Sequence, residues 1–203
     1  MAPGPAGGVA VRLHRAAPWW LVCALAAAGA LAAQAVDPTL LRWQPELGLS
    51  QPWRLISAAW VHLSPLHLAG NLLGTALVAA LGTVAGCGLR AAIAWALAWP
   101  LTHLGLLLQP ALVSYGGLSG LLHAGVAVAI CQLVRGETGQ RRLIGVGLAL
   151  GLTTKLLLEA PWQGGPLRHL PGWGIAIAPL AHSSGALAGL LCALVCRVGA
   201  GGR

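Results

Sequence analysis

The stretch that decides the fold is AAIAWALAWPLTHLGLLLQPALVSYGGLSGLLHAGVAVAICQLV, residues 91–134, which contains no Asp, Glu, Lys or Arg. It is long enough for two membrane-spanning helices of about 20 residues each. We expect these helices at 91–108 and 118–134, separated by a short loop that contains Pro110 and two glycines. Ser119 lies among glycines at the start of the second helix. Placing a polar side chain within a membrane costs free energy, so we expect Ser119 to have a structural or functional role.

The composition of the whole chain indicates a membrane protein. Hydrophobic residues make up 57% and charged residues 8%, and the mean hydropathy is +0.78, whereas an ordinary soluble domain carries about 25% charged residues. The 203 residues suffice for roughly six spans of about 20 residues, so we predict an all-α bundle of six transmembrane helices. The other expected spans are 18–36, 66–84, 143–158 and a last one that starts at Ile175 or Leu180 and ends at Val198. One domain, 18–198, then lies between short tails, 1–17 and 199–203.

The net charge of +8 does not indicate a nucleic-acid-binding protein, because the twelve Lys and Arg residues are dispersed among apolar segments. Cytoplasmic loops retain positive charge, and in the six-span arrangement eight arginines fall on one side and three on the other. Both termini are therefore expected in the cytoplasm, with the Trp53 loop, Ser119 and His182 near the outer face. The eight are Arg12, Arg15, Arg90, Arg135, Arg141, Arg142, Arg197 and Arg203, and the three are Arg42, Arg54 and Arg168.

The first apolar run has two interpretations. Its basic start, apolar centre and the small-residue sequence Ala33-Gln34-Ala35 also fit a secretory signal peptide. We favour a retained helix because it gives an even number of spans, in agreement with the charge pattern.

The cysteines number five and lack the paired spacing of a zinc site or a disulfide framework. We interpret them as small buried hydrophobic residues. They are Cys23, Cys87, Cys131, Cys192 and Cys196.

Ser119 is either a helix-packing residue or a nucleophile. Tyr115, Gly116 and Gly117 form a flexible approach to it, and Gly120 follows it. In the first turn of a helix, free backbone N–H groups and the helix dipole can stabilise an oxyanion. The setting favours a nucleophile.

A nucleophilic serine needs a base, and His182 is the best candidate. Gly185 and Gly189 form a small-residue stripe beside it, and Gly120 and Ala124 form another after Ser119. Such stripes allow two helices to approach closely, which would bring serine and histidine together as a dyad. His123, one turn after Ser119, is the competing base.

Three polar residues near the second expected span suggest an oxyanion site. His67 and Asn71 are four residues apart and share one face of the helix, so both could donate hydrogen bonds to the carbonyl oxygen of a substrate. His62 lies just before the helix, where we expect it to tie down the preceding loop.

These residues together resemble the rhomboid intramembrane serine proteases, over roughly residues 40–198. The resemblance includes Trp53-Arg54, the array of His62, His67 and Asn71, Gly117-Leu118-Ser119-Gly120, and Ala181-His182 followed by Gly185 and Gly189. It implies a six-helix fold, a Ser119 nucleophile, a His182 base, an oxyanion site of His67, Asn71 and the Ser119 N–H, and membrane-protein substrates. No metal or organic cofactor is required.

One position departs from the family pattern, because His123 stands where many rhomboids have a tyrosine that packs on the catalytic histidine. The small size and the motif GLSGLLH, together with Lys155 and Glu159, look more like the rhombosortase branch. Its members are thought to process bacterial proteins with a Gly-Gly-containing C-terminal membrane tail, which would place this chain in a bacterial inner membrane.

Lys155 and Glu159 are charged residues near the outer end of the fifth expected span, and their spacing permits an ion pair. They are either a snorkelling lysine with an interfacial glutamate or a pair that recognises the substrate. Because the other acidic residues fall in loops, we expect no carboxylate to complete a triad with His182.

Two further functional classes remain open at this point. The seven histidines could ligate haem in an electron-transfer protein, or the chain could be an inactive rhomboid-like protein that binds membrane clients without cleaving them.

Overall fold

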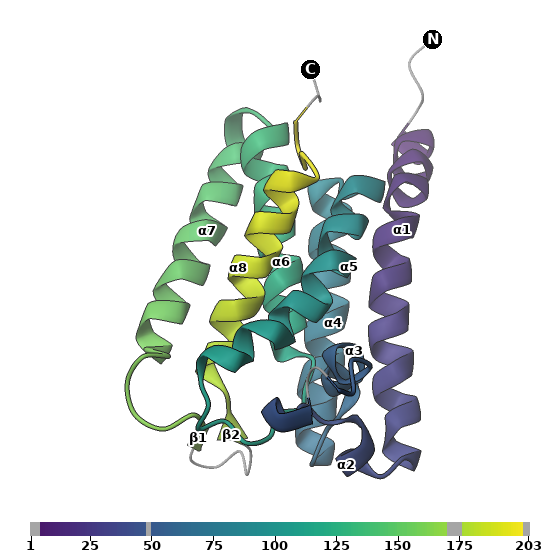
Figure 1. Cartoon of the computed structure of the whole chain (residues 1–203). Coiled ribbons are helices and arrows are strands. Elements are labelled where there is room, and N and C mark those ends of the chain that lie inside the picture. Colours follow the sequence, from purple (N-terminus) through teal and green to yellow (C-terminus); the bar gives the residue numbers. More distant parts are fainter. Residues whose placement is uncertain (1–4, 48–49, 170–175, 201–203) are drawn as a thin grey trace.

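The computed structural model describes residues 5–47, 50–169 and 176–200 of the chain, and within these it is a bundle of long helices that lie side by side (Figure 1). Both termini lie at one end of the bundle, and the short helices and strands lie at the other. The long helices are α1 (Pro5–Ala32), α4 (Pro65–Ala85), α5 (Leu89–Leu104), α6 (Ser119–Gly136), α7 (Gly139–Glu159) and α8 (Pro179–Val195).

Four helical segments among the described residues are long and apolar enough to cross a membrane. They are His14–Ala35, Pro65–Ala85, Leu89–Leu108 and Ser119–Gly136. Helix α8 is apolar but shorter, and α7 carries Arg141, Arg142, Lys155 and Glu159. The predicted all-α membrane bundle is confirmed, and a count of six spans stays a prediction.

The boundaries of the helices follow local signals. Ser64 caps α4 by accepting a hydrogen bond from the His67 N–H at 3.2 Å, and Pro65 fills the first position, where its missing N–H costs nothing. Gly86 ends the helix with a φ of +75°, a left-handed conformation that favours glycine. Helix α1 begins at Pro5, well before the expected start at residue 18, because helix-compatible Ala, Leu and Arg precede the apolar run. The alternative start of the last span, Ile175, lies outside the described residues.

Tryptophan side chains join the helices in the core. Trp19 of α1 and Trp95 of α5 are fully buried with ring centroids 4.4 Å apart. Each indole N–H donates to a helix carbonyl, Trp19 to Val78 at 3.1 Å and Trp95 to Leu121 at 2.8 Å, which removes the penalty of burying that donor. Four of the five cysteines are buried, as the sequence predicted, and Cys196 is half-buried.

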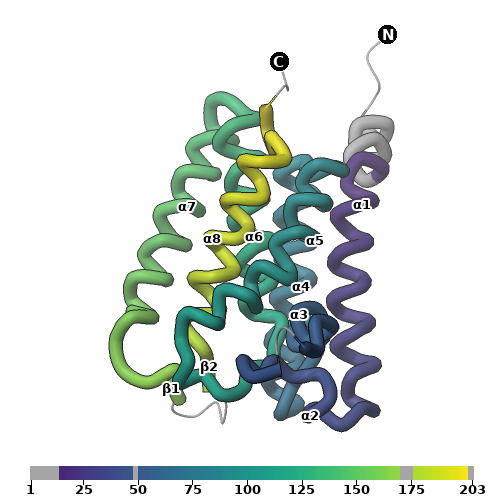
Figure 2. The backbone as a smooth tube through the Cα atoms, in the orientation of Figure 1, coloured from purple at the N-terminus to yellow at the C-terminus, as the bar shows by residue number. Residues whose placement is uncertain are grey.

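Short elements cover the end of the bundle opposite the termini (Figure 2). Buried Arg54 fixes this region, because its guanidinium donates to the carbonyl oxygens of Thr39 and Arg42 at 2.9 and 2.6 Å and to Gln51 at 2.7 Å. The indole of Trp53 donates to the Leu40 carbonyl at 3.3 Å. The elements are η1 (Ala33–Ala35), α2 (Pro38–Leu41), η2 (Pro45–Leu47), α3 (Arg54–Ser57), η3 (Ala58–Trp60), η4 (Gly105–Leu108) and the antiparallel pair β1 (Arg168–His169) and β2 (Ala176–Ile177).

Candidate active site

The loop that leads into α6 places Ser119 at the first residue of that helix. Gly117 has a φ of +136°, which a residue with a side chain rarely adopts. Its N–H donates to the Ala58 carbonyl at 3.0 Å, and its own carbonyl accepts from the Tyr115 hydroxyl at 3.0 Å. Tyr115 also exchanges backbone hydrogen bonds with Trp43. The turn before Ser119 is therefore held from two sides.

Helices α6 and α8 are in contact along the two predicted stripes of small residues. A methyl group on Gly185 would overlap the carbonyl oxygen of Gly120, and one on Gly189 would overlap the backbone of Ala124. A methyl group on Gly120 would lie 2.8 Å from the Ala181 carbonyl oxygen. Glycine is thus required for the backbones to approach this closely, as the spacing predicted.

This close approach brings His182 of α8 to Ser119 of α6. The Nε2 atom of His182 lies 2.9 Å from the Ser119 Oγ, a hydrogen-bond distance between two residues 63 positions apart. His182 is buried, and Ser119 is partly exposed. An uncharged imidazole at this distance can take the hydroxyl proton and leave a nucleophilic oxygen.

His67 and Asn71 lie beside the turn that precedes Ser119. A methyl group on Gly117 would be 2.9 Å from the Nε2 of His67 and 3.7 Å from the Nδ2 of Asn71. Both side chains therefore lie next to the turn that carries the Ser119 N–H. An oxyanion formed by attack of Ser119 would have to bind in this place.

His62 orients Asn71 as well as the loop before α4. Its Nδ1 lies 3.0 Å from the Trp60 carbonyl oxygen, which only accepts, so Nδ1 carries the proton. Its Nε2 then accepts from the Asn71 amide at 3.0 Å, and this leaves one N–H of the amide free for another acceptor. Burial lowers the pKa of His62 to about 4, so the ring stays neutral and keeps this arrangement at physiological pH.

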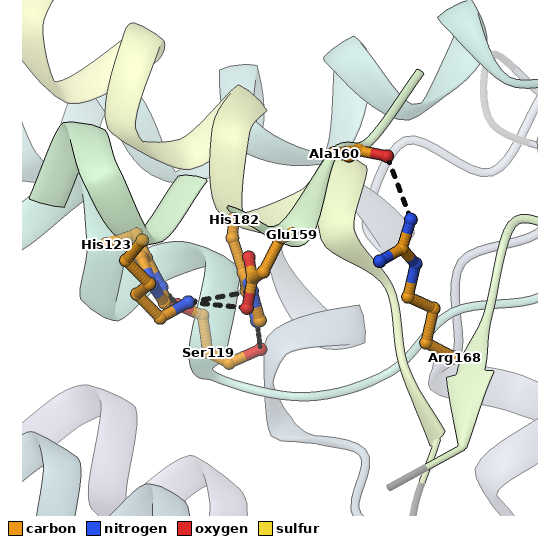
Figure 3. Close-up of polar contacts among 7 residues, drawn as sticks. Ser119, His123, Glu159, Ala160, Arg168 and His182 are labelled. Atoms are coloured by element: carbon orange, nitrogen blue, oxygen red, sulfur yellow. Dashed lines mark hydrogen bonds and ion pairs between the residues drawn. The ribbon is translucent and has the colours of Figure 1, made fainter. Parts of the chain in front are cut away.

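His123 lies against the face of His182. Its Nδ1 donates to the Ser119 carbonyl at 2.6 Å, and the two imidazole rings stack with centroids 4.2 Å apart and planes at 16° (Figure 3). Because this nitrogen is engaged by the backbone, the geometry favours His182 over His123 as the base. His123 instead packs on His182, as the tyrosine found at this position in many rhomboids is expected to do.

The expectation that no carboxylate reaches His182 is wrong. Glu159, the last residue of α7, places Oε2 2.8 Å from the His182 Nδ1 (Figure 3). Its Oε1 lies 2.7 Å from the Lys155 Nζ, so the predicted ion pair is present. The sequence did contain a signal, since Glu159 is the one acidic residue within an apolar segment, but only the packing of α7 beside α8 directs it to the histidine.

Comparison with protein families identifies the chain. The model of the Rhomboid domain matches residues 49–198, which is 150 of the 203 residues. The chain belongs to the rhomboid family. Rhomboids are intramembrane serine proteases that act on membrane-protein substrates. A search of curated proteins found no match to the chain.

The rhomboid match covers every residue of the site and leaves out residues 1–48 and 199–203. Within the matched region, the bundle brings the three polar groups of the sequence, around Asn71, Ser119 and His182, to the same end. The bundle also places Glu159 and the ring of His123 against His182.

Proposed function

We propose that this rhomboid is an active serine endopeptidase in which Ser119 is the nucleophile and His182 the general base. The observation that carries the proposal is the 2.9 Å contact between the Ser119 Oγ and the His182 Nε2. It lies where two helices meet through glycines inside an apolar bundle. A buried histidine kept only for packing would not need a serine hydroxyl at its second nitrogen.

The reaction is acyl transfer in two halves. His182 takes the Ser119 proton while Oγ attacks a substrate carbonyl, and the proton then passes to the departing amide nitrogen. The Ser119 N–H, the free N–H of Asn71 and His67 are the donors for the oxyanion. A water molecule then attacks the acyl-enzyme and gives its proton to His182, which restores the serine hydroxyl.

The substrates are proteins with a membrane-anchoring helix that partly unwinds beside α7. Similarity to the rhombosortase branch supports a C-terminal anchor that contains Gly-Gly as the preferred substrate. The bundle then crosses the membrane six times, with both termini in the bacterial cytoplasm and the site facing the periplasm. The common position of the two termini (Figure 1) and the larger number of arginines on that side support this orientation.

The test is the rate at which a fluorophosphonate probe labels purified protein, measured in wild type and in Ser119→Ala and His182→Ala variants of verified folding. Loss of labelling in both variants supports the proposal. Absence of labelling in a folded wild type that also fails to cleave Gly-Gly-anchored substrates refutes it and favours a client-binding rhomboid without activity.

A further inference from the structure

Glu159 is positioned to act on His182 from the side opposite Ser119. We propose, building on the proposed function, that the Glu159 carboxylate accepts a hydrogen bond from His182 Nδ1 and so holds the ring in the catalytically competent tautomer. Lys155 holds the carboxylate in place through an ion pair. The site is then a Ser-His-Glu triad within a membrane bundle, and Glu159 is a positioning residue.

The two carboxylate oxygens of Glu159 have separate partners. Oε1 binds the Lys155 Nζ at 2.7 Å, and Oε2 binds the His182 Nδ1 at 2.8 Å. The Glu159 side chain is only 15% exposed, whereas that of Lys155 is 44% exposed. The lysine therefore reaches inward from the surface of α7 and fixes the carboxylate on its outer side, while the inner oxygen faces the histidine.

The proton on His182 can be assigned from its neighbours. If Nδ1 carries it, Nδ1 donates to Glu159, and Nε2 presents a lone pair to the Ser119 hydroxyl. If Nε2 carries it, Nδ1 could accept only from Lys155, at 3.3 Å, and the ring could no longer take the serine proton. The charge-assisted contact of 2.8 Å to Glu159 decides the tautomer, because an unprotonated Nδ1 at that distance would set its lone pair against the lone pairs of the carboxylate oxygen.

The other groups that face His182 fit this assignment. The His123 ring stacks on its flat face and engages its own Nδ1 with the Ser119 carbonyl, so it restricts rotation without competing for either nitrogen of His182. Lys155 is the one cation beside the ring among the described residues, and it is neutralised by Glu159. The His182 ring is thus held on one face by His123 and at its two nitrogens by Glu159 and Ser119.

A role in substrate recognition, the alternative for Glu159 and Lys155, makes a different prediction. A fluorophosphonate is small and lacks a membrane anchor, so its reaction with Ser119 depends on activation of the hydroxyl and not on recognition of a helix. A residue that only recognises substrate affects KM and leaves probe labelling unchanged, whereas a residue that positions His182 affects kcat and labelling together.

The experiment compares Glu159→Gln with Glu137→Gln. Glu137 forms the same kind of ion pair with Arg141, at 2.9 Å and four residues apart, but it lies directly after α6, in the turn that leads to α7, at the opposite end of that helix from Glu159. We expect Glu159→Gln to lower the labelling rate and kcat on the order of 10²- to 10⁴-fold, as carboxylate loss does in other serine hydrolases. KM should change little, and Glu137→Gln should behave as wild type.

A second measurement does not depend on the folding of any carboxylate variant. In wild-type protein with ¹⁵N-labelled histidine, solid-state NMR should show the His182 Nδ1 protonated and Nε2 bare, with His182→Ala used to assign the signals. A bare Nδ1 would overturn the proposal. So would wild-type labelling by a folded Glu159→Gln protein, or an equal loss of activity in Glu137→Gln.

The outcomes separate this inference from the function on which it rests. Labelling that requires Ser119 but survives Glu159→Gln refutes the triad and leaves the protease intact. Absence of Ser119-dependent labelling in folded wild type refutes both.

Discussion

Gly185→Ala tests whether the contact between α6 and α8 creates the catalytic pair. The added methyl group would overlap the Gly120 carbonyl oxygen, which belongs to a helix backbone and cannot rotate away. Restoring van der Waals separation requires α8 to shift by roughly 1 Å. The same shift would take the Nε2 of His182 from 2.9 Å to beyond hydrogen-bond reach of the Ser119 Oγ. We expect the labelling rate to fall on the order of 10²-fold, with a stability loss of about 1–3 kcal/mol from overpacking.

The assay pairs fluorophosphonate labelling with unfolding in dodecyl sulfate. Gly151→Ala is the matched control, because it lies within α7 and a methyl group there would meet no atom within 4 Å. It should label as wild type and unfold at the same or a higher denaturant concentration, since alanine is the better helix former. Wild-type labelling in a folded Gly185→Ala protein would refute the reasoning, because the site would then tolerate a wider separation of the helices.

Three further predictions concern the loops and the core. Gly117→Ala should lower kcat by at least about 10-fold, because its φ of +136° is strained for alanine and its methyl group would collide with His67; a cleavage assay with unchanged kcat would contradict this. The pKa of His62 is about 4 in the folded chain against 6.5 for the free side chain, so the unfolded chain binds the proton first and stability should decrease as pH falls from 6.5 to 4. His62→Gln should remove on the order of 3 kcal/mol of that pH dependence, measured by steric trapping; an unchanged profile would show that other groups cause it. Trp19→Phe should cost about 1–3 kcal/mol, because the smaller ring fills less of the core and the indole hydrogen bond to the carbonyl of Val78 is lost; unfolding in dodecyl sulfate at the wild-type midpoint would contradict it.

The membrane class and the order of the helices could be predicted from composition and hydropathy, because every apolar run of about 20 residues has to find a nonpolar environment. The boundaries were less certain. Helix α7 is not among the four long apolar helices found in the described residues, because it carries Arg141, Arg142, Lys155 and Glu159. Helix α1 extends beyond its apolar run because helical hydrogen bonding does not stop where hydropathy falls.

The pairing of Ser119 with His182 was also accessible from the sequence. Glycine and alanine at a spacing of four residues on both helices predict a close crossing, and the polar residue at the start of each stripe must then lie near the other. The sequence therefore determined the bundle, the family and the two residues on which the proposed chemistry rests.

Only the tertiary structure decided the second contact of His182. Glu159 is on a helix whose sequence specifies an ion pair with Lys155 four residues earlier but not the direction in which the other carboxylate oxygen points. That direction depends on how α7 lies beside α8, and the spacing of residues along α7 does not predict this packing. The same holds for the stacking of His123 on His182. Spacing along one helix determines which residues share a face, whereas the partner of that face is determined by packing between helices distant in sequence.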